Sequence, residues 1–395
     1  MLRRLCAAAL AGEKVTNLPQ VDWEKVYIES QQQSVSLLAF QALGETLSDA
    51  TVFAEWKRFA HLNLQNNAVV YRNHKQLHDL LEKAEIPYCT LKGCASARFY
   101  PDPLLRSMGD VDFLVRREDL DRTEKLLLEN GFQKDDLGEH ICHDAYERDG
   151  FWFELHFEVA GLPDGKDGEK IHEILDDVFR LTEEEQIENA VFRRPNPRHH
   201  GLIILMHTYH HLLSEGIGLR HLCDIAAFLN SFSNEEFLEV FESPLKEVGL
   251  WKFAQSLGTL CHTALEIPYR EWMGKIDREW CAQLLADIFS GGNFGFKDAA
   301  RTHQGLAISD RGKDGVGRNG VLQTIVSVNR LAQQRFPVFG RVAVLRPFGW
   351  IALGFYLVWR ILTRQREMPD LHGMVVESKK RKELYSKFHL FEKEE

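Results

Sequence analysis

The chain is 395 residues long and carries 48 Lys and Arg against 58 Asp and Glu, which gives a formal net charge of −10 at pH 7. This length is sufficient for two or three domains, and the hydrophobic content of 44% excludes wholesale disorder. The negative charge argues against a protein held on nucleic acid mainly by phosphate neutralisation, so nucleic acid is not expected as a partner.

The cysteines of the chain indicate its redox environment. There are seven of them, widely scattered and without a Cys-x-x-Cys pair. This pattern favours reduced thiols in a cytoplasmic location over a disulfide framework or a cysteine zinc site.

The hydrophobic pattern changes after residue 85. Apolar residues recur at helical spacing before it, which predicts an N-terminal helical region over residues 1–85. The short apolar run IPYCTLKG then predicts a strand that ends in a tight turn at Gly93. DVDFLV, at residues 110–115, predicts the next strand, and residues 117–131 predict a helix after it.

A longer segment, residues 146–160, alternates between apolar and polar side chains. Phe153 and Leu155 lie on one side of this predicted strand, and Glu154 and His156 lie on the other. A sheet with helices on one face is the simplest architecture for such strands. We therefore predict an α+β fold, with a small mixed β-sheet core over residues 86–165 that is flanked by N-terminal and C-terminal helical regions.

Two aspartates in the 110–115 strand are candidate metal ligands. Asp110 and Asp112 are two positions apart, so their side chains project to the same face. Like charges this close repel each other and raise one pKa unless a cation lies between them. Mg²⁺ prefers carboxylate oxygens and substrate phosphates, and Glu154 is the natural third acid on a neighbouring strand. The alternative is that Asp110 begins the strand at a turn while Asp112 lies on a solvated edge.

Residues 91–115 resemble the DNA polymerase β-type nucleotidyltransferase superfamily in their sequence, LKGCASARFYPDPLLRSMGDVDFLV. The order of the segments around them resembles that superfamily as well. The chain looks most like the little-characterised bacterial nucleotidyltransferase branch of that superfamily. The resemblance implies that Gly93 forms a turn for nucleotide phosphates. It also implies that Asp110 and Asp112 hold metal ions and that Glu154 is the third acid.

Three further residues near this motif are candidates for nucleotide binding. Cys94 stands where the wider superfamily has Ser, so backbone N–H groups would contact phosphate in place of a hydroxyl. Lys92 and Arg106 would supply positive charge for a triphosphate, with Arg106 acting as a bidentate fork. The alternatives are a surface lysine at a strand end and an arginine that only neutralises the acidic pair.

Helical periodicity returns over residues 166–290, which predicts a helical domain. His207 and His211 lie four apart in it, a spacing that can chelate zinc. No acid lies between them as in His-Glu-x-x-His, so a zinc hydrolase is not indicated. Together with His156, they are candidates for a substrate pocket, and packing or solvated histidines are the alternative.

The C-terminal part of the chain is predicted to contain a linker or mobile loop over residues 291–320 and a helical tail over residues 321–395. An apolar stretch at residues 347–359 is too short to span a bilayer, which needs about 20 residues. A buried helix is one interpretation of this stretch. Peripheral membrane contact through residues 341–366 is the other.

The resemblance and the acidic residues predict an enzyme that depends on two Mg²⁺ ions, with Mn²⁺ as an alternative. It would transfer a nucleoside monophosphate from a nucleoside triphosphate to an unidentified hydroxyl or phosphate acceptor and release pyrophosphate. The competing hypothesis is a non-catalytic nucleotide-fold module that docks on a partner or on a membrane surface.

Overall fold

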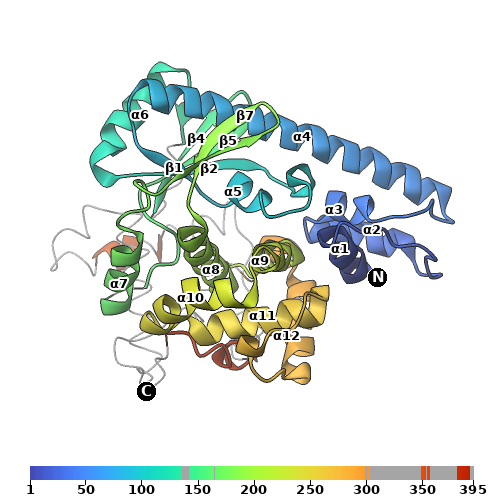
Figure 1. The fold of residues 1–395 in the computed structure, drawn as a ribbon. Helices are drawn as coiled ribbons and strands as arrows, with labels where there is room; N and C mark the ends of the chain where they lie inside the picture. The colour runs from blue at the N-terminus through green and yellow to red at the C-terminus, as the bar shows by residue number, and fades with distance from the viewer. Residues whose placement is uncertain are drawn as a thin grey trace. The chain divides into compact units, whose positions relative to one another are not determined.

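The structure is a computed structural model that describes residues 1–135, 142–163, 165–298, 301, 348–352, 354–355 and 380–391. Its contacts divide the chain into two units, of which the first comprises Met1–Leu212, Gly216–Asp298 and Ser386–Glu395. The elements below lie almost entirely in this unit (Figure 1). No helix among the described residues is long and apolar enough to cross a membrane. Most of the predicted linker and of the segment 341–366 lies outside the described residues.

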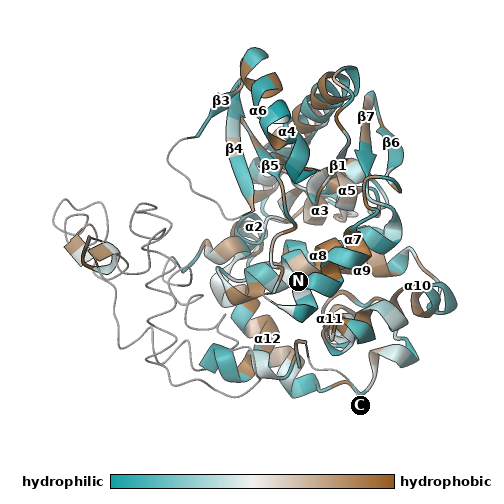
Figure 2. Cartoon of the chain, turned by 90° about the vertical axis from the view of Figure 1, so that its left-hand side faces the viewer, coloured by the Kyte–Doolittle hydropathy of each residue, from teal (hydrophilic) through white to brown (hydrophobic). Residues whose placement is uncertain are grey.

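Four helices occupy most of the N-terminal region: α1 (Leu2–Leu10), α2 (Trp23–Gln32), α3 (Ser36–Gln41) and α4 (Ala50–Lys83). The long α4 begins where the Asp49 carboxylate accepts hydrogen bonds from the backbone N–H groups of Thr51 and Val52. This cap satisfies donors that the first helical turn leaves unpaired. Helix α4 carries both hydrophilic and hydrophobic residues (Figure 2). Its buried residues recur at helical spacing, so one face of the helix packs in the core.

A five-stranded mixed sheet forms the centre of the unit, in the order β1-β2-β5-β4-β3. Strands β2 and β5 are parallel, and the other neighbours are antiparallel. The predicted α+β fold with a small mixed sheet is therefore confirmed. The bounds of the strands are β1 (Tyr88–Thr90), β2 (Asp110–Val115), β3 (Gln133–Lys134), β4 (His143–Arg148) and β5 (Phe151–His156).

The two faces of this sheet differ in polarity. Val111 and Phe113 of β2 and Phe153 of β5 lie in a buried core with Leu77 of α4 and with Leu127 of α6 (Leu120–Glu129). Because side chains alternate along a strand, the residues between these apolar positions project to the opposite face. The acidic residues of β2 and β5 are therefore kept out of the apolar core.

Two hairpins differ from the sequence-based expectations. The segment 146–160 does not form one strand, because Asp149 and Gly150 have positive φ angles of 54° and 80° and turn the chain between β4 and β5. Asp-Gly is a preferred pair for such a two-residue turn. Residues 183–194 were expected to be helical, but they form a second antiparallel sheet of β6 (Glu183–Ile187) and β7 (Ala190–Arg194).

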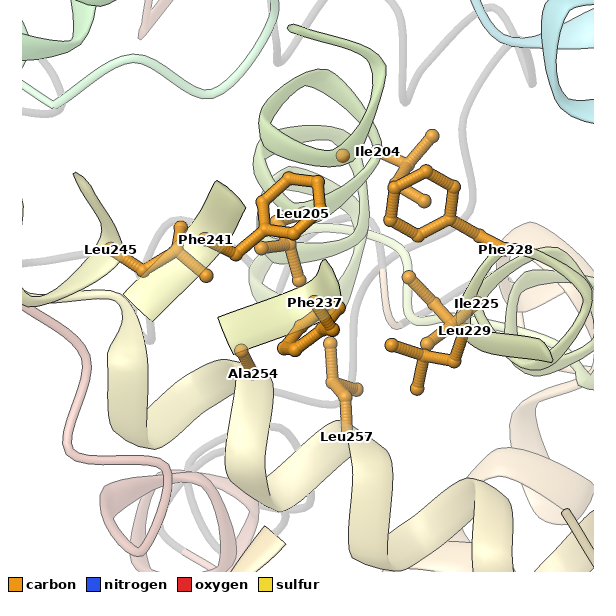
Figure 3. Close-up of a pocket in the computed structure, with 11 residues that line it drawn as sticks. Ile204, Leu205, Ile225, Phe228, Leu229, Phe237, Phe241, Leu245, Ala254 and Leu257 are labelled. Atoms are coloured by element: carbon orange, nitrogen blue, oxygen red, sulfur yellow. The ribbon is translucent and has the colours of Figure 1, made fainter. Parts of the chain in front are cut away.

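The remaining helices are α5 (Gly93–Ala97), α7 (Lys166–Leu175), α8 (Pro197–Leu213), α9 (Leu219–Asn230), α10 (Asn234–Glu247), α11 (Trp251–Leu265) and α12 (Arg278–Gly291). Helices α8 to α11 surround a small pocket lined entirely by apolar residues (Figure 3). A Cβ atom built on Gly201 would lie 2.5 Å from the Phe241 ring, so glycine is needed for this close approach. We regard the pocket as part of the helical core.

His74 in α4 should make the stability of the protein dependent on pH. Its side chain is buried against Phe192, and neither ring nitrogen has a hydrogen-bond partner in the described part of the chain. Burial lowers the pKa of His74 from 6.5 to about 4, so the folded state resists a proton that the unfolded chain accepts. The free energy of unfolding should therefore fall as pH drops from 6.5 to 4, by about 3 kcal/mol from this residue.

Replacement of His74 by Leu should remove that part of the pH dependence, as measured by urea unfolding at a series of pH values. His61→Leu is the matched control, because His61 is an exposed histidine on the same helix. An unchanged pH profile in His74→Leu would contradict the assignment.

Candidate active site

The parallel pairing of β2 and β5 brings the predicted acidic residues together. Asp112 lies opposite Glu154 in the register of the two strands, and Asp110 lies opposite Trp152. Residues in register on neighbouring strands share a face of the sheet, so the three carboxylates are on one side. The side chain of Asp112 is only 3% exposed and its strand lies between two others, so the solvated-edge alternative is wrong.

Lys92 is drawn into this acidic group. Its Nζ lies 3.0 Å from Asp112 Oδ1 and 3.8 Å from Glu154 Oε2. Burial by itself would lower the pKa of Lys92, but the charges of Asp112, Glu154 and Asp110 raise it above its usual value. The lysine is also held at φ 44°, a backbone conformation that residues other than glycine rarely adopt. Such strain is concentrated at functional sites, and Lys92 is not a surface lysine.

His156 supplies a second cation to the same carboxylates. Its Nε2 lies 3.1 Å from Asp112 Oδ1 and 3.2 Å from Glu154 Oε2, so this nitrogen carries the hydrogen of both contacts. Burial and Lys92 lower the pKa of His156, but hydrogen bonds to Asp112, Cys142 and Glu154 outweigh them and raise it to about 10. The contact of Nε2 with Glu154 fixes the position of that carboxylate.

The two aspartates have opposite electrostatic environments. The charge of Asp112, with burial and Glu154 adding to it, raises the pKa of Asp110 to about 6. Burial would also raise the pKa of Asp112, but Lys92 and His156 hold it well below its usual range. Asp112 is therefore fully ionised, whereas the ionised form of Asp110 is destabilised by repulsion from the neighbouring carboxylates.

The donor set suits a hard divalent cation. Asp112, Glu154 and His156 offer ligand atoms that all lie within 4.8 Å of one another, although Asp110 is not a member of this group. Carboxylate oxygens are preferred ligands of Mg²⁺, and a divalent ion would relieve the repulsion that raises the pKa of Asp110. The residues fit the ion that the sequence predicts.

The predicted phosphate turn lies next to this group. Gly93 begins the short helix α5, and a Cβ atom built on it would meet no atom within 4 Å. Cys94 is fully buried, with its Sγ 3.6 Å from Met108 Sδ, and burial raises the pKa of its thiol well above 9.0. Its side chain therefore faces the core, and only its backbone is left for a phosphate.

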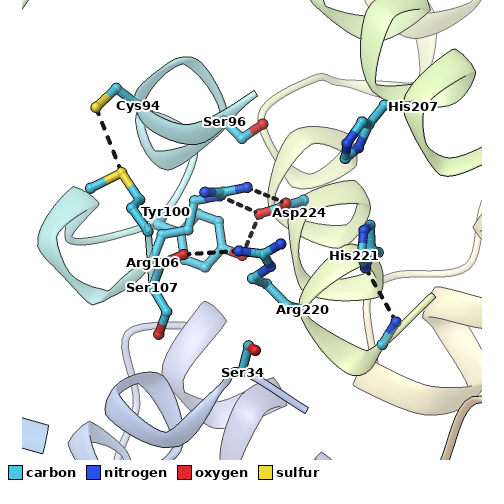
Figure 4. A network of polar contacts seen from close by, with 12 residues as sticks. Ser34, Cys94, Ser96, Tyr100, Arg106, Ser107, His207, Arg220, His221 and Asp224 are labelled. Atoms are coloured by element: carbon cyan, nitrogen blue, oxygen red, sulfur yellow. Dashed lines mark hydrogen bonds and ion pairs between the residues drawn. The ribbon is translucent and has the colours of Figure 1, made fainter. Parts of the chain in front are cut away.

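Arg106 has a partner that the sequence did not reveal (Figure 4). Its Nε and Nη2 each donate a 2.8 Å hydrogen bond to the Asp224 carboxylate, which also accepts one from the Tyr100 hydroxyl. The guanidinium is only 5% exposed. Neutralisation of the acidic pair by Arg106 is therefore wrong. A contact of Arg106 with a triphosphate stays a prediction.

Arg220 is a residue of this site that sequence reasoning missed. It donates to the Ser107 carbonyl at 3.3 Å, its Nε has no partner among the described residues, and its charge lowers the pKa of Asp110. It therefore faces the acidic residues from helix α9. Its position one helical turn from Asp224 was the available signal, but that spacing suggested a salt bridge instead.

The histidines of α8 lie beside this arginine. His207 and His211 have their Nε2 atoms 2.9 Å apart, and the His207 ring stacks on His221 of α9. Burial lowers the pKa of His207 and His221 well below 6.5, with the charge of Lys92 among the further causes. The His207 and His221 rings are therefore neutral, and the place of His207 and His211 in a substrate pocket stays a prediction.

The sequence was compared with families of known proteins. The family model described as an uncharacterised nucleotidyltransferase matches residues 19–266, which is more than half of the chain. The matched range includes the whole five-stranded sheet and helices α8 and α9. No curated protein matches the sequence.

Proposed function

Because the chain belongs to this family of uncharacterised nucleotidyltransferases, we propose that it transfers a nucleoside monophosphate from a nucleoside triphosphate to a hydroxyl or phosphate acceptor in an Mg²⁺-dependent reaction. Membership of the family confirms the resemblance found in the sequence and the assignment of the protein as a nucleotidyltransferase. The observation that supports the metal dependence is the register of β2 and β5, which lines Asp112 up with Glu154 on the face that also carries Asp110.

In this proposal Asp110, Asp112 and Glu154 hold two Mg²⁺ ions. When bound, these ions would neutralise the charge of the triphosphate and lower the pKa of the acceptor hydroxyl. The oxygen of the acceptor forms a bond to the α-phosphorus, and the bond between that phosphorus and the departing pyrophosphate breaks. The electron pair of the broken bond leaves with pyrophosphate.

The residues of the chain have separate tasks in this reaction. Glu154 is the more exposed partner of the Asp112 pair, at 26% against 3%, and would take the proton of the acceptor hydroxyl. His156 holds that carboxylate in place through its Nε2–H. Arg220 and Lys92 would offset the charge of the departing pyrophosphate, because both lie near the acidic residues and carry positive charge.

Thermal unfolding with each of the four common nucleoside triphosphates tests the proposal without knowledge of the acceptor. At a concentration of about 100 Kd, a bound ligand should stabilise the folded state by about 2.7 kcal/mol, which raises Tm by several degrees. We expect this shift for at least one triphosphate, with Mg²⁺ present and not with EDTA. An equal shift in EDTA, or no shift with any of the four, would contradict it and favour the non-catalytic module.

A further inference from the structure

A second group of donor atoms adjoins the carboxylates. Cys142, His143 and His156 each offer one ligand atom, and these three atoms all lie within 4.8 Å of one another. Cys142 Sγ is 3.6 Å from His143 Nδ1. The group shares His156 with the acidic site, but it consists of sulfur and nitrogen atoms.

The backbone fixes these three residues. His143 and His156 are direct partners across the antiparallel pair β4–β5, and their ring centroids are 4.8 Å apart. The Cys142 carbonyl accepts a 3.0 Å hydrogen bond from the Phe157 N–H, which extends the pairing by one position. The three side chains are therefore held on one end of a rigid hairpin, and such placement favours a precise ligand geometry.

His156 has one nitrogen that the acidic site does not use. Its Nε2 contacts Asp112 and Glu154, whereas its Nδ1 is buried and, among the described residues, has no hydrogen-bond partner apart from the Cys142 thiol. The side chain is only 1% exposed. A buried imidazole nitrogen that lies beside a thiol and a second imidazole is placed as a metal ligand would be, because an ion can replace the proton shared with the thiol.

The separations suit a tetrahedral ion. With Zn–S bonds of about 2.3 Å and Zn–N bonds of about 2.05 Å, a tetrahedral site requires sulfur and nitrogen about 3.5 Å apart. The 3.6 Å from Cys142 Sγ to His143 Nδ1 agrees with that requirement. Thiolate and imidazole ligands select Zn²⁺ and similar ions over Mg²⁺, which prefers oxygen.

We propose that Cys142, His143 and His156 bind a thiophilic divalent ion such as Zn²⁺, with one coordination position left for water or substrate. Binding displaces the protons of the Cys142 thiol and of His156 Nδ1, so affinity rises with pH. This assignment revises the sequence-based expectation that the chain has no cysteine zinc site. It does not depend on the proposed transferase reaction.

The ion would be coupled to the carboxylates through the two histidines. A histidine that ligates a metal through one nitrogen commonly donates its other N–H to a carboxylate, which fixes the orientation of both groups. His156 Nε2 already contacts Asp112 and Glu154, and His143 Nε2 lies 3.9 Å from Glu154 Oε1. Occupancy of this site would therefore fix the hydrogen positions at the acidic residues.

Titration of the whole protein with Co²⁺ at about pH 8 tests the site by absorption spectroscopy. We expect one bound ion with a thiolate-to-cobalt charge-transfer band, which Zn²⁺ abolishes by displacing Co²⁺. Cys142→Ser should lose the band and His143→Gln should weaken binding at least tenfold, while the Tm of each variant confirms folding. The absence of a band in the wild-type protein, or an unchanged band in Cys142→Ser, would overturn the proposal.

Two controls separate this site from its neighbours. His172→Gln changes a histidine that contacts Glu158 beyond the end of β5, and it should leave Co²⁺ binding unchanged. Asp110→Asn alters the acidic site alone and should keep the charge-transfer band even where Mg²⁺-dependent nucleotide binding is lost. Loss of the band in Asp110→Asn would show that the two sites are one, and it would overturn the assignment.

Discussion

Replacement of Asp110 by Asn is expected to abolish nucleotidyl transfer and, at the same time, to raise the free energy of unfolding. The rate of pyrophosphate release should fall at least about 10³-fold, equivalent to about 4 kcal/mol of transition-state stabilisation, because a proposed metal ligand is lost. The stability should rise because the ionised Asp110 is repelled by Asp112, which raises its pKa from 3.8 to about 6.

The pH dependence of this stabilisation has a definite sign. Since the pKa of Asp110 is higher in the folded state, the unfolded chain loses its proton first as pH rises from 3.8 to 6. The destabilisation of the folded state by ionised Asp110 is absent below this range and complete above it. The free energy of unfolding of Asp110→Asn should therefore exceed that of the wild type by about 1 to 2 kcal/mol at pH 8 and equal it at pH 3.5. Urea unfolding in EDTA measures this difference, and an Asp110→Asn variant less stable than the wild type at pH 8 would contradict the account.

Replacement of Asp112 by Asn is expected to abolish transfer to the same extent but to lower the free energy of unfolding. Asp112 is the common partner of Lys92 at 3.0 Å and of His156 at 3.1 Å. Removing one member of a buried charge group costs about 3–5 kcal/mol, and Glu154, which also contacts both cations, should limit the loss to about 2–3 kcal/mol.

The sign of the pH effect is opposite to that of Asp110. Lys92 and His156 hold the pKa of Asp112 below its usual value, so its contribution is present above pH 3.8 and is lost as pH falls further. The difference in the free energy of unfolding between the wild type and Asp112→Asn should therefore decrease as pH falls below 3.8. The two variants are matched controls for each other, because they make the same change two positions apart on one strand. Shifts of the same sign at pH 8 would rule out the proposed electrostatics.

The polar face of the sheet was predictable because it depends on local spacing. Residues two apart in a strand share a face, so the sequence alone indicates that Asp110 and Asp112 project together. Glu154 was reached by the same alternation in its own strand. The parallel register that lines up Asp112 with Glu154 depends on chain segments about 40 residues apart, and the family resemblance supplied that part.

The partners of the cationic side chains were not predictable in this way. Arg106 and Asp224 are separated by 118 positions, and their pairing depends on how helix α9 packs against helix α5. A sequence shows charges but not which distant charge is buried beside which. The same reason explains why Arg220 was missed.

The donor group of Cys142, His143 and His156 was not predicted from the sequence, because the boundary of the predicted strand was misplaced. With residues 146–160 taken as one strand, Cys142 and His143 had no assigned neighbours. The Asp149-Gly150 turn starts a separate strand, β4, whose pairing with β5 sets His143 opposite His156. The Asp149-Gly150 pair is itself a hairpin signal, and a hairpin at this position places His143 and His156 together.

Mn²⁺ binding in the presence of a nucleoside triphosphate, counted by electron paramagnetic resonance, tests the metal role of the carboxylates most directly. The account predicts that the wild-type protein binds Mn²⁺ together with the nucleotide and that Asp110→Asn and Asp112→Asn each lose that binding. Cys142→Ser should retain it, since Mn²⁺ prefers oxygen ligands. Wild-type levels of bound Mn²⁺ in both aspartate variants would contradict the assignment of these carboxylates as the metal site of the enzyme.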